Sequence, residues 1–442
     1  MTAHKHFKHL VRARMGKTGE SYTSARRIIL QQAPLSETEK AKSKSSARQA
    51  PGDGSPTRFH MPGCIPAPTA LRVLLTAAGV RDPRDGKPLS EAMVFGIAGG
   101  IAIGIAAFRY EKGDFSSFYI TGRHLWQDHV LYFKEALKRL GISPMIRETA
   151  GAKAADKQLR EALASGMPCI AWVRGYHIVT VYGIDDARSI AHVGDLADQP
   201  IELPLAELAT ARSEIKSYKN RLLSIAPAQE PADLTEPVLG GLQACCDGLG
   251  ANLSKGPKSW ATLEALKIWA GRLHGSKEKE SWARMFPRGH LLWQGLTSIH
   301  DYIEHHRTGG GLSRPMFAEF LTEASQLPGM QQLREVADHY AQLGAAWTAL
   351  AEAALPPKVP AFEKARELLT CQAELRSTGD SSGAQPREEL CKRISDLGKS
   401  ARDQFPLSEA ESDALLQSLQ QRVMALYEGE VAARDALADC LN

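Results

Sequence analysis

The hydrophobic and polar positions divide the chain into a mixed helix and strand region followed by a helical region. Leu71, Leu74 and Leu75 recur at helical spacing, directly after two prolines that suit the first turn of a helix. Two more amphipathic helices are predicted at 125–140 and 154–165. Short runs rich in β-branched residues, separated by turn residues, predict strands at 117–122, 168–173, 178–184, 189–193 and 221–225.

Beyond residue 237 nearly every apolar run has helical spacing. Helices are predicted at 238–250, 258–275, 278–285, 288–305, 315–326, 330–354, 360–377 and 387–441, with a break at Pro406. Helices first and then short strands indicate an α+β fold with an antiparallel sheet, which an all-helical C-terminal domain follows.

Composition marks the domain boundaries. Residues 33–57 are rich in Ala, Ser, Lys, Pro and Gly and carry too little apolar surface to order themselves, so this stretch is predicted to be a flexible linker. A chain of 442 residues also exceeds one compact domain. We expect a basic helical arm (1–32), the linker (33–57), a catalytic domain (58–228), a helical domain (238–355) and a helical extension (356–442).

The charge adds little to this description except at the N-terminus. The net charge is +4, which is too small to indicate a nucleic-acid partner by itself. Much of the excess positive charge lies in residues 1–32, which predict a solvated basic arm or, as the alternative, a weak contact with a polyanion. Three histidines in this arm have no second set of ligands, so no metal or other cofactor is expected.

The cysteines and the most apolar window indicate a cytoplasmic protein. The seven cysteines are scattered and show no CxxC spacing, as is typical of reduced thiols. The N-terminus has no apolar core of a signal peptide. The sixteen residues at 93–108 are fewer than the roughly 20 that a membrane-spanning helix needs, so a buried helix and loop is predicted there, and no membrane contact.

Cys64 is a candidate nucleophile because it stands just before the Leu71 helix. The positive end of a helix dipole favours the thiolate form. His177 opens one predicted strand and Asp195 closes the next, so in a hairpin the carboxylate could come level with the imidazole and accept a hydrogen bond. Spacing alone leaves the alternatives open: a buried cysteine can act as a small apolar residue, and a histidine at the start of a strand can be structural.

The order of several motifs resembles a known family. They are Cys64 with Thr69–Arg72, Leu89–Gly96 with Gly99 and Gly100, Leu140–Ile142, His177–Asp185, and Asp195. Together they resemble papain-like cysteine enzymes, and most closely the N-terminal domain of the butirosin biosynthesis protein H family. Residues 307–324 are similar to the marker stretch of the uncharacterised helical domain that often follows it.

The resemblance implies a cysteine-dependent acyltransferase of specialised metabolism. Cys64 would be the nucleophile, His177 the general base and Asp195 the residue that orients it. The donor would be an acyl thioester or an acyl carrier protein, and the acceptor a small-molecule amine. The backbone N–H of Cys64 would be one oxyanion donor. Cys64 lies seven residues before Leu71, farther than the family pattern places its cysteine, and Pro66 occupies the shorter spacing.

Two further groups of residues are candidates for substrate binding. His124, Trp126 and Gln127 form a polar and aromatic cluster that could line the cleft, although an ordinary helix N-terminus would look the same. Arg307 and Arg314 flank the Thr308–Gly311 turn and could contact an anionic substrate or carrier. The alternative is a tight interhelical turn packed against the catalytic domain, because the lysine of a phosphate-binding loop is absent from this stretch.

Two other functions remain open at this point. A peptidase or amidase would use the same three residues with water as the acceptor. A non-catalytic binding module would use the basic arm instead, and the displaced position of Cys64 favours it.

Overall fold

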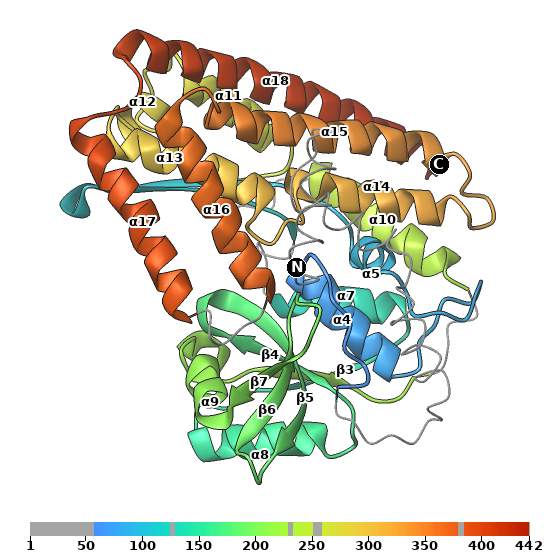
Figure 1. Ribbon diagram of the computed structural model, residues 1–442. Coiled ribbons are helices and arrows are strands. Elements are labelled where there is room, and N and C mark those ends of the chain that lie inside the picture. Colours follow the sequence, from blue (N-terminus) through green and yellow to red (C-terminus); the bar gives the residue numbers. More distant parts are fainter. Residues whose placement is uncertain (1–56, 124–128, 229–232, 251–258, 379–383, 442) are drawn as a thin grey trace, which may run out of the picture.

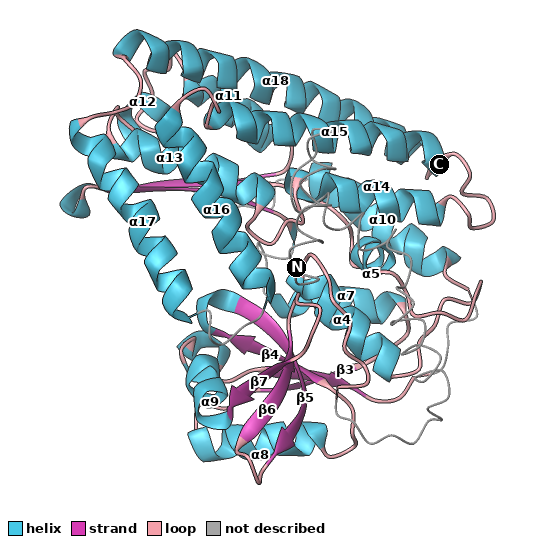
Figure 2. Ribbon diagram, in the orientation of Figure 1, coloured by secondary structure: helices cyan, strands magenta, loops and turns pink. Residues whose placement is uncertain are grey.

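The computed structural model describes residues 57–123, 129–228, 233–250, 259–378 and 384–441. The predicted basic arm and all but Thr57 of the predicted linker lie outside these ranges. Within them, the α+β class is confirmed: helices and an antiparallel sheet come first, and helices dominate the rest (Figures 1 and 2).

The main sheet has six antiparallel strands in the order β3-β8-β4-β5-β6-β7. Their bounds are β3 Pro144–Arg147, β4 Cys169–Val173, β5 His177–Asp185, β6 Ile190–Gly194, β7 Ile201–Pro204 and β8 Leu222–Ile225. Four of them confirm predicted strands. The strands β3 and β7 were not predicted: each is short and contains a proline, which argues against a strand in the sequence pattern.

Helices cover both faces of this sheet (Figure 1). Alternate residues of a strand point to opposite faces. Ile170 and Trp172 of β4 therefore pack in one core with α4 (Pro66–Ala77) and α7 (His129–Arg139). Cys169 and Ala171 pack in a second core with α8 (Ala152–Leu163) and α9 (Leu205–Ser213). Because both faces are covered, β4 is buried along its whole length.

The glycine-rich apolar segment at 93–108 contains a helix, as predicted, but also a strand. The helix α5 (Glu91–Ile97) is followed by Gly99 and Gly100, both of which have positive φ. The strand β1 (Gly104–Tyr110) then pairs with β2 (Phe115–Thr121) and with β9 (Ser259–Ala261). The prediction of a loop after the helix is therefore wrong for the residues that form β1. A continuous apolar run does not distinguish a buried strand from other buried segments.

The helical region confirms the predicted helices, except that the prediction of a helix at 258–275 is wrong at its start, where the strand β9 lies before α11. Its elements are α10 Thr235–Gly250, α11 Glu264–Leu273, α12 Trp282–Met285, α13 His290–Glu304, α14 Arg314–Ala324, α15 Leu333–Ala354, α16 Pro360–Thr378, α17 Ala384–Asp403 and α18 Glu409–Asp439. The predicted break at Pro406 falls between α17 and α18. The tryptophans at 269, 282, 293 and 347 are buried in helix packing.

The two regions share one apolar core. That core contains residues of α4 and α5 together with residues of α10, α14 and α15. The contact between α5 and α10 is very close, because a Cβ built on Gly241 would lie 2.3 Å from the carbonyl oxygen of Gly96. In the described ranges, no helix combines the length and the apolar character needed to cross a membrane.

A half-buried carboxyl links α5 to α14 and should make stability depend on pH. The hydroxyl of Ser90, the N-cap of α5, donates to Glu323 Oε2 at 2.7 Å. Burial raises the pKa of Glu323 to about 7, so the folded chain holds a proton that the unfolded chain releases above its ordinary pKa. This contribution to stability is present at low pH and is lost as the pH rises through about 7.

We therefore expect the melting temperature of the wild-type chain to fall more between about pH 5 and about pH 8 than that of Glu323→Gln. Differential scanning fluorimetry over this range measures both. Parallel curves for the two proteins would contradict the assignment.

Candidate functional site

Cys64 lies in an extended turn that leads into α4. Ile65 is the N-cap of the helix, with φ −123° and ψ 123°, and Cys64 is half-buried and not part of a disulfide. Pro66 and Pro68 lie in the first turn and have no N–H, which suits an end where amide groups lack helical partners. The amide groups of Cys64 and Ile65 are therefore important donors at this end of the helix.

A carboxylate of the same chain accepts from both of these amides. Glu91, the first residue of α5, accepts from the Cys64 N–H at 3.0 Å and from the Ile65 N–H at 2.7 Å. The buried hydroxyl of Thr69 lies 2.9 Å from the same carboxylate oxygen. Burial raises the pKa of Glu91, while the amide hydrogen bonds oppose that rise.

The predicted oxyanion donor is therefore occupied in this structure. The Cys64 N–H donates to Glu91, and an acyl oxyanion could use it only after the carboxylate had moved. Sequence reasoning missed Glu91 because it acts across 27 residues through backbone amides, and backbone amides carry no sequence signal. The nearest signal was its place directly after the helix cap Ser90.

His177 and Asp195 form the hydrogen bond that the sequence predicts. His177 Nε2 lies 2.8 Å from Asp195 Oδ2, and the other carboxylate oxygen accepts from the Leu196 N–H at 2.8 Å. The register pairs Thr180 with Gly194, so Asp195 follows the end of β6 and the bond runs diagonally rather than level. The pair engages Nε2, which leaves Nδ1 as the ring nitrogen for proton exchange with a thiol.

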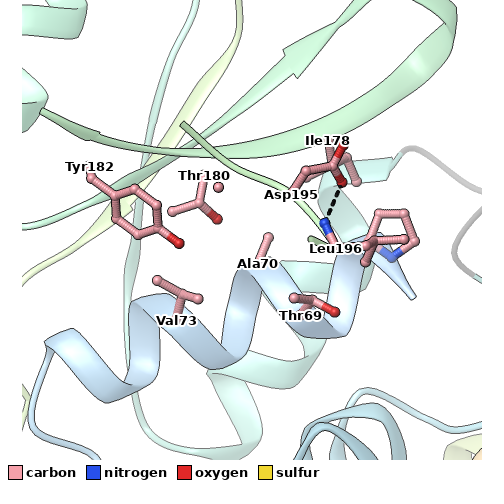
Figure 3. A pocket seen from close by; sticks show the side chains of 10 residues that line it. Thr69, Ala70, Val73, Ile178, Thr180, Tyr182, Asp195 and Leu196 are labelled. Atoms are coloured by element: carbon pink, nitrogen blue, oxygen red, sulfur yellow. Dashed lines mark hydrogen bonds between the residues drawn. The ribbon is translucent and has the colours of Figure 1, made fainter. Parts of the chain in front are cut away.

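The Cys64 turn lies beside this pair. The N–H of Gly63 donates to the carbonyl of Leu196 at 3.4 Å, and α4 packs against β5. Figure 3 shows Asp195 and Leu196 above the first turn of α4, close to Thr69. A small pocket lies between the helix and the sheet, lined by Pro66, Thr69, Ala70 and Val73 on one side and by Ile178, Thr180, Tyr182, Gly194, Asp195 and Leu196 on the other.

The helical region contributes the Thr308–Gly311 turn to the site. The Arg307 guanidinium donates to the carbonyl of Tyr176 at 2.9 Å and to that of Gly175 at 2.7 Å, directly before His177. Gly309 has φ +71°, and a Cβ built on it would lie 3.6 Å from the Cβ of Cys64. The turn is thus packed against the first region, which was the alternative to ligand binding. A substrate contact of Arg307 stays a prediction.

The predicted ligand contact of Arg314 is corrected by the structure. Its side chain is fully buried, and its Nε lies 2.7 Å from Glu430 Oε1 of α18. The same oxygen accepts from the indole N–H of Trp347 at 2.7 Å. Arg314 therefore belongs to the core of the helical region, and its charge is matched there by a carboxylate.

The three remaining candidates, His124, Trp126 and Gln127, lie outside the described residues. In the described part of the chain, no cluster of three or more His, Cys, Asp or Glu side chains is arranged to bind a metal.

The fold and the site together define an α+β domain with a helix-end cysteine next to a His–Asp pair. In the comparison with known families, residues 67–196 match the family model described as butirosin biosynthesis protein H, N-terminal. Residues 206–375 match a domain of unknown function, DUF4872. The chain therefore carries the N-terminal domain of the butirosin biosynthesis protein H family, followed by that helical domain. No curated protein matches the chain.

The family match includes two of the three predicted catalytic residues. His177 and Asp195 lie within the matched residues, whereas Cys64 comes before their first residue, Ala67. The match therefore neither supports nor contradicts the predicted role of Cys64.

Proposed function

We propose that the chain is a cysteine acyltransferase that moves an acyl or aminoacyl group from a thioester donor to an amine acceptor. The observation that carries the proposal is the 2.8 Å hydrogen bond between His177 and Asp195, with the Cys64 turn bonded beside it. The relation to butirosin biosynthesis protein H supports a role in specialised metabolism. The donor thioester would be a small acyl thioester or an acyl carrier protein in the cytoplasm.

The chemistry would run through a thioester on Cys64. The thiol of Cys64 gives its proton to His177 Nδ1, and the sulfur attacks the donor carbonyl carbon. The bond from that carbon to the donor sulfur breaks, and the donor thiolate takes the proton from His177. The acceptor amine then attacks the Cys64 thioester, an amide forms, and the proton released by the amine returns to Cys64 through His177. Asp195 stabilises the imidazolium and fixes its orientation.

The contact of Glu91 favours a second candidate, a domain that keeps the fold but binds a partner without covalent chemistry. A carboxylate on the Cys64 amide opposes both the thiolate and an oxyanion at that position. In that case the basic arm at residues 1–32 would supply the binding surface.

Intact mass spectrometry with a panel of acyl thioesters tests the proposal. The acyltransferase predicts an adduct on Cys64 and an amide product that appears only when an amine acceptor is present. A product that forms in water alone would indicate a peptidase or amidase. The absence of any Cys64 adduct across the panel would favour the non-catalytic domain.

Replacement of Asp195 by Asn should slow acylation of Cys64 by roughly two orders of magnitude, because the imidazolium loses its counter-charge and its preferred tautomer. Acylation reactions that are quenched at successive times and analysed by mass spectrometry measure the rate. Asp186→Asn is a matched control, since Asp186 lies at the exposed end of the same hairpin and pairs with Arg160. Equal rates in both variants would remove Asp195 from the proposed site.

A further inference from the structure

Glu91 acts on the proposed nucleophile as well as on the end of a helix. Its carboxylate binds the amide of the proposed nucleophile itself, at 3.0 Å from both oxygens, and the next amide at 2.7 Å. These are the donors closest to Cys64. The carboxylate thus determines both the backbone position and the electrostatic surroundings of this residue.

We propose that Glu91 is a positioning residue that fixes the Cys64 turn and, through its charge, keeps the thiol neutral until an acyl donor displaces the carboxylate. The inference deepens the proposed function, because it concerns the same nucleophile. It also accounts for the unusual distance of Cys64 from Leu71, since the carboxylate secures the longer turn that this distance creates.

The charges around the carboxylate support this role. Burial raises the pKa of Glu91, but the Ile65 and Cys64 amides, the Thr69 hydroxyl and Arg72 all favour its ionised form. A thiolate at Cys64 would be a second negative charge beside this carboxylate, and like charges at short range disfavour ionisation. The carboxylate also offsets the positive end of α4. Arg72 of α4 is the cation that acts on Glu91. Tyr132 of α7 is a buried phenol whose pKa is raised by burial and, to a smaller extent, by Glu91. Arg72 is itself held by the carbonyl of Leu89 at 3.0 Å.

The Glu91 carboxylate and the oxyanion of an acylation intermediate would compete for these amides. A tetrahedral intermediate needs preorganised N–H donors for its oxyanion. The Cys64 N–H cannot serve a carboxylate and an oxyanion in the same place, so acylation through this donor requires Glu91 to withdraw. Thr69, whose hydroxyl lies near both Glu91 and the carbonyl of Ile65, can keep its bond to Ile65 when the carboxylate moves.

Alkylation of Cys64 tests the inference without any acyl donor. Iodoacetamide modification of the Cys64 peptide is followed by mass spectrometry from about pH 5 to about pH 10 in the wild-type chain and in Glu91→Gln. We expect the midpoint of the pH–rate profile to fall by about one pH unit in Glu91→Gln, with about tenfold faster alkylation at acidic pH. Glu411→Gln is the matched control, because Glu411 caps α18 through the Ser408 N–H at 2.8 Å.

Glu91→Asp separates charge from support of the turn. It keeps the negative charge but shortens the side chain, so we expect a wild-type alkylation profile and a lower melting temperature. Identical profiles for wild type, Glu91→Gln and Glu91→Asp would reduce Glu91 to a structural cap and overturn the inference.

A second measurement covers the case in which Glu91→Gln does not fold. A crystal structure of the wild-type chain with an acyl aldehyde bound to Cys64 as a hemithioacetal should show Glu91 withdrawn from the Cys64 N–H. A carboxylate that remains on both amides would overturn the inference. Normal acyl transfer with an unchanged alkylation profile would remove this inference alone, whereas a shifted profile without acyl transfer would remove only the proposed function.

Discussion

Replacing Cys64 by alanine should abolish covalent acylation of the chain by acyl thioesters. The loss should be complete, because an alanine methyl group cannot form the thioester through which the proposed reaction runs. The His177–Asp195 hydrogen bond does not involve Cys64, so the variant should fold and keep its melting temperature within about one degree or two. Intact mass spectrometry after incubation with the acyl thioester panel measures the adduct.

Cys371→Ala is a suitable control for this experiment. Cys371 is exposed on α16 and has a free thiol, so it can react non-specifically with a thioester. We expect Cys371→Ala to acylate as the wild-type chain does. An adduct that persists in Cys64→Ala and disappears in Cys371→Ala would show that the labelling is surface chemistry, and it would sink the acyltransferase proposal.

Replacing Arg314 by methionine should lower the free energy of unfolding by about 3–5 kcal/mol. The change leaves the Glu430 carboxylate buried with only the indole N–H of Trp347 as a described hydrogen-bond donor. A buried charge without its counter-charge is far more costly than the ion pair itself was worth. Chemical denaturation by urea measures the effect.

The double variant Arg314→Met with Glu430→Leu distinguishes this cause from lost packing. Removing both charges should restore much of the stability, because the unpaired carboxylate is gone. Arg160→Met serves as the exposed comparison: Arg160 pairs with Asp156 at the surface and its loss should have little effect. A double variant no more stable than Arg314→Met would contradict the electrostatic explanation.

The sequence predicts the fold well where hydrophobic periodicity is long and local. The helices from α10 to α18 follow from apolar spacing alone, and the central strands β4 to β6 from short β-branched runs between turns. The strand β9 could not be predicted in this way, because its partner β1 lies more than 140 residues earlier and three residues carry no periodic signal.

In the candidate site, too, the contacts between residues close in the chain were predicted and those between distant residues were not. His177 and Asp195 belong to neighbouring strands of one hairpin, so their contact follows from local topology. Arg314 was misassigned because its partner, Glu430, is 116 residues away in sequence, and a sequence pattern does not show that the two meet in a core. Glu91 was missed for a related reason, since it recognises backbone amides rather than side chains.

The position of β9 has a consequence for how this protein can be divided. A polypeptide that ended at residue 228 would lack β9, one of the two strands that pair with β1, the helix α10 against α5, and the arginine that holds the two carbonyls before His177. Such a fragment would expose apolar surface of α4 and α5 to water and would tend to aggregate. Exchange of the helical half between relatives should therefore succeed only when the residues facing α5 and the His177 turn are exchanged with it.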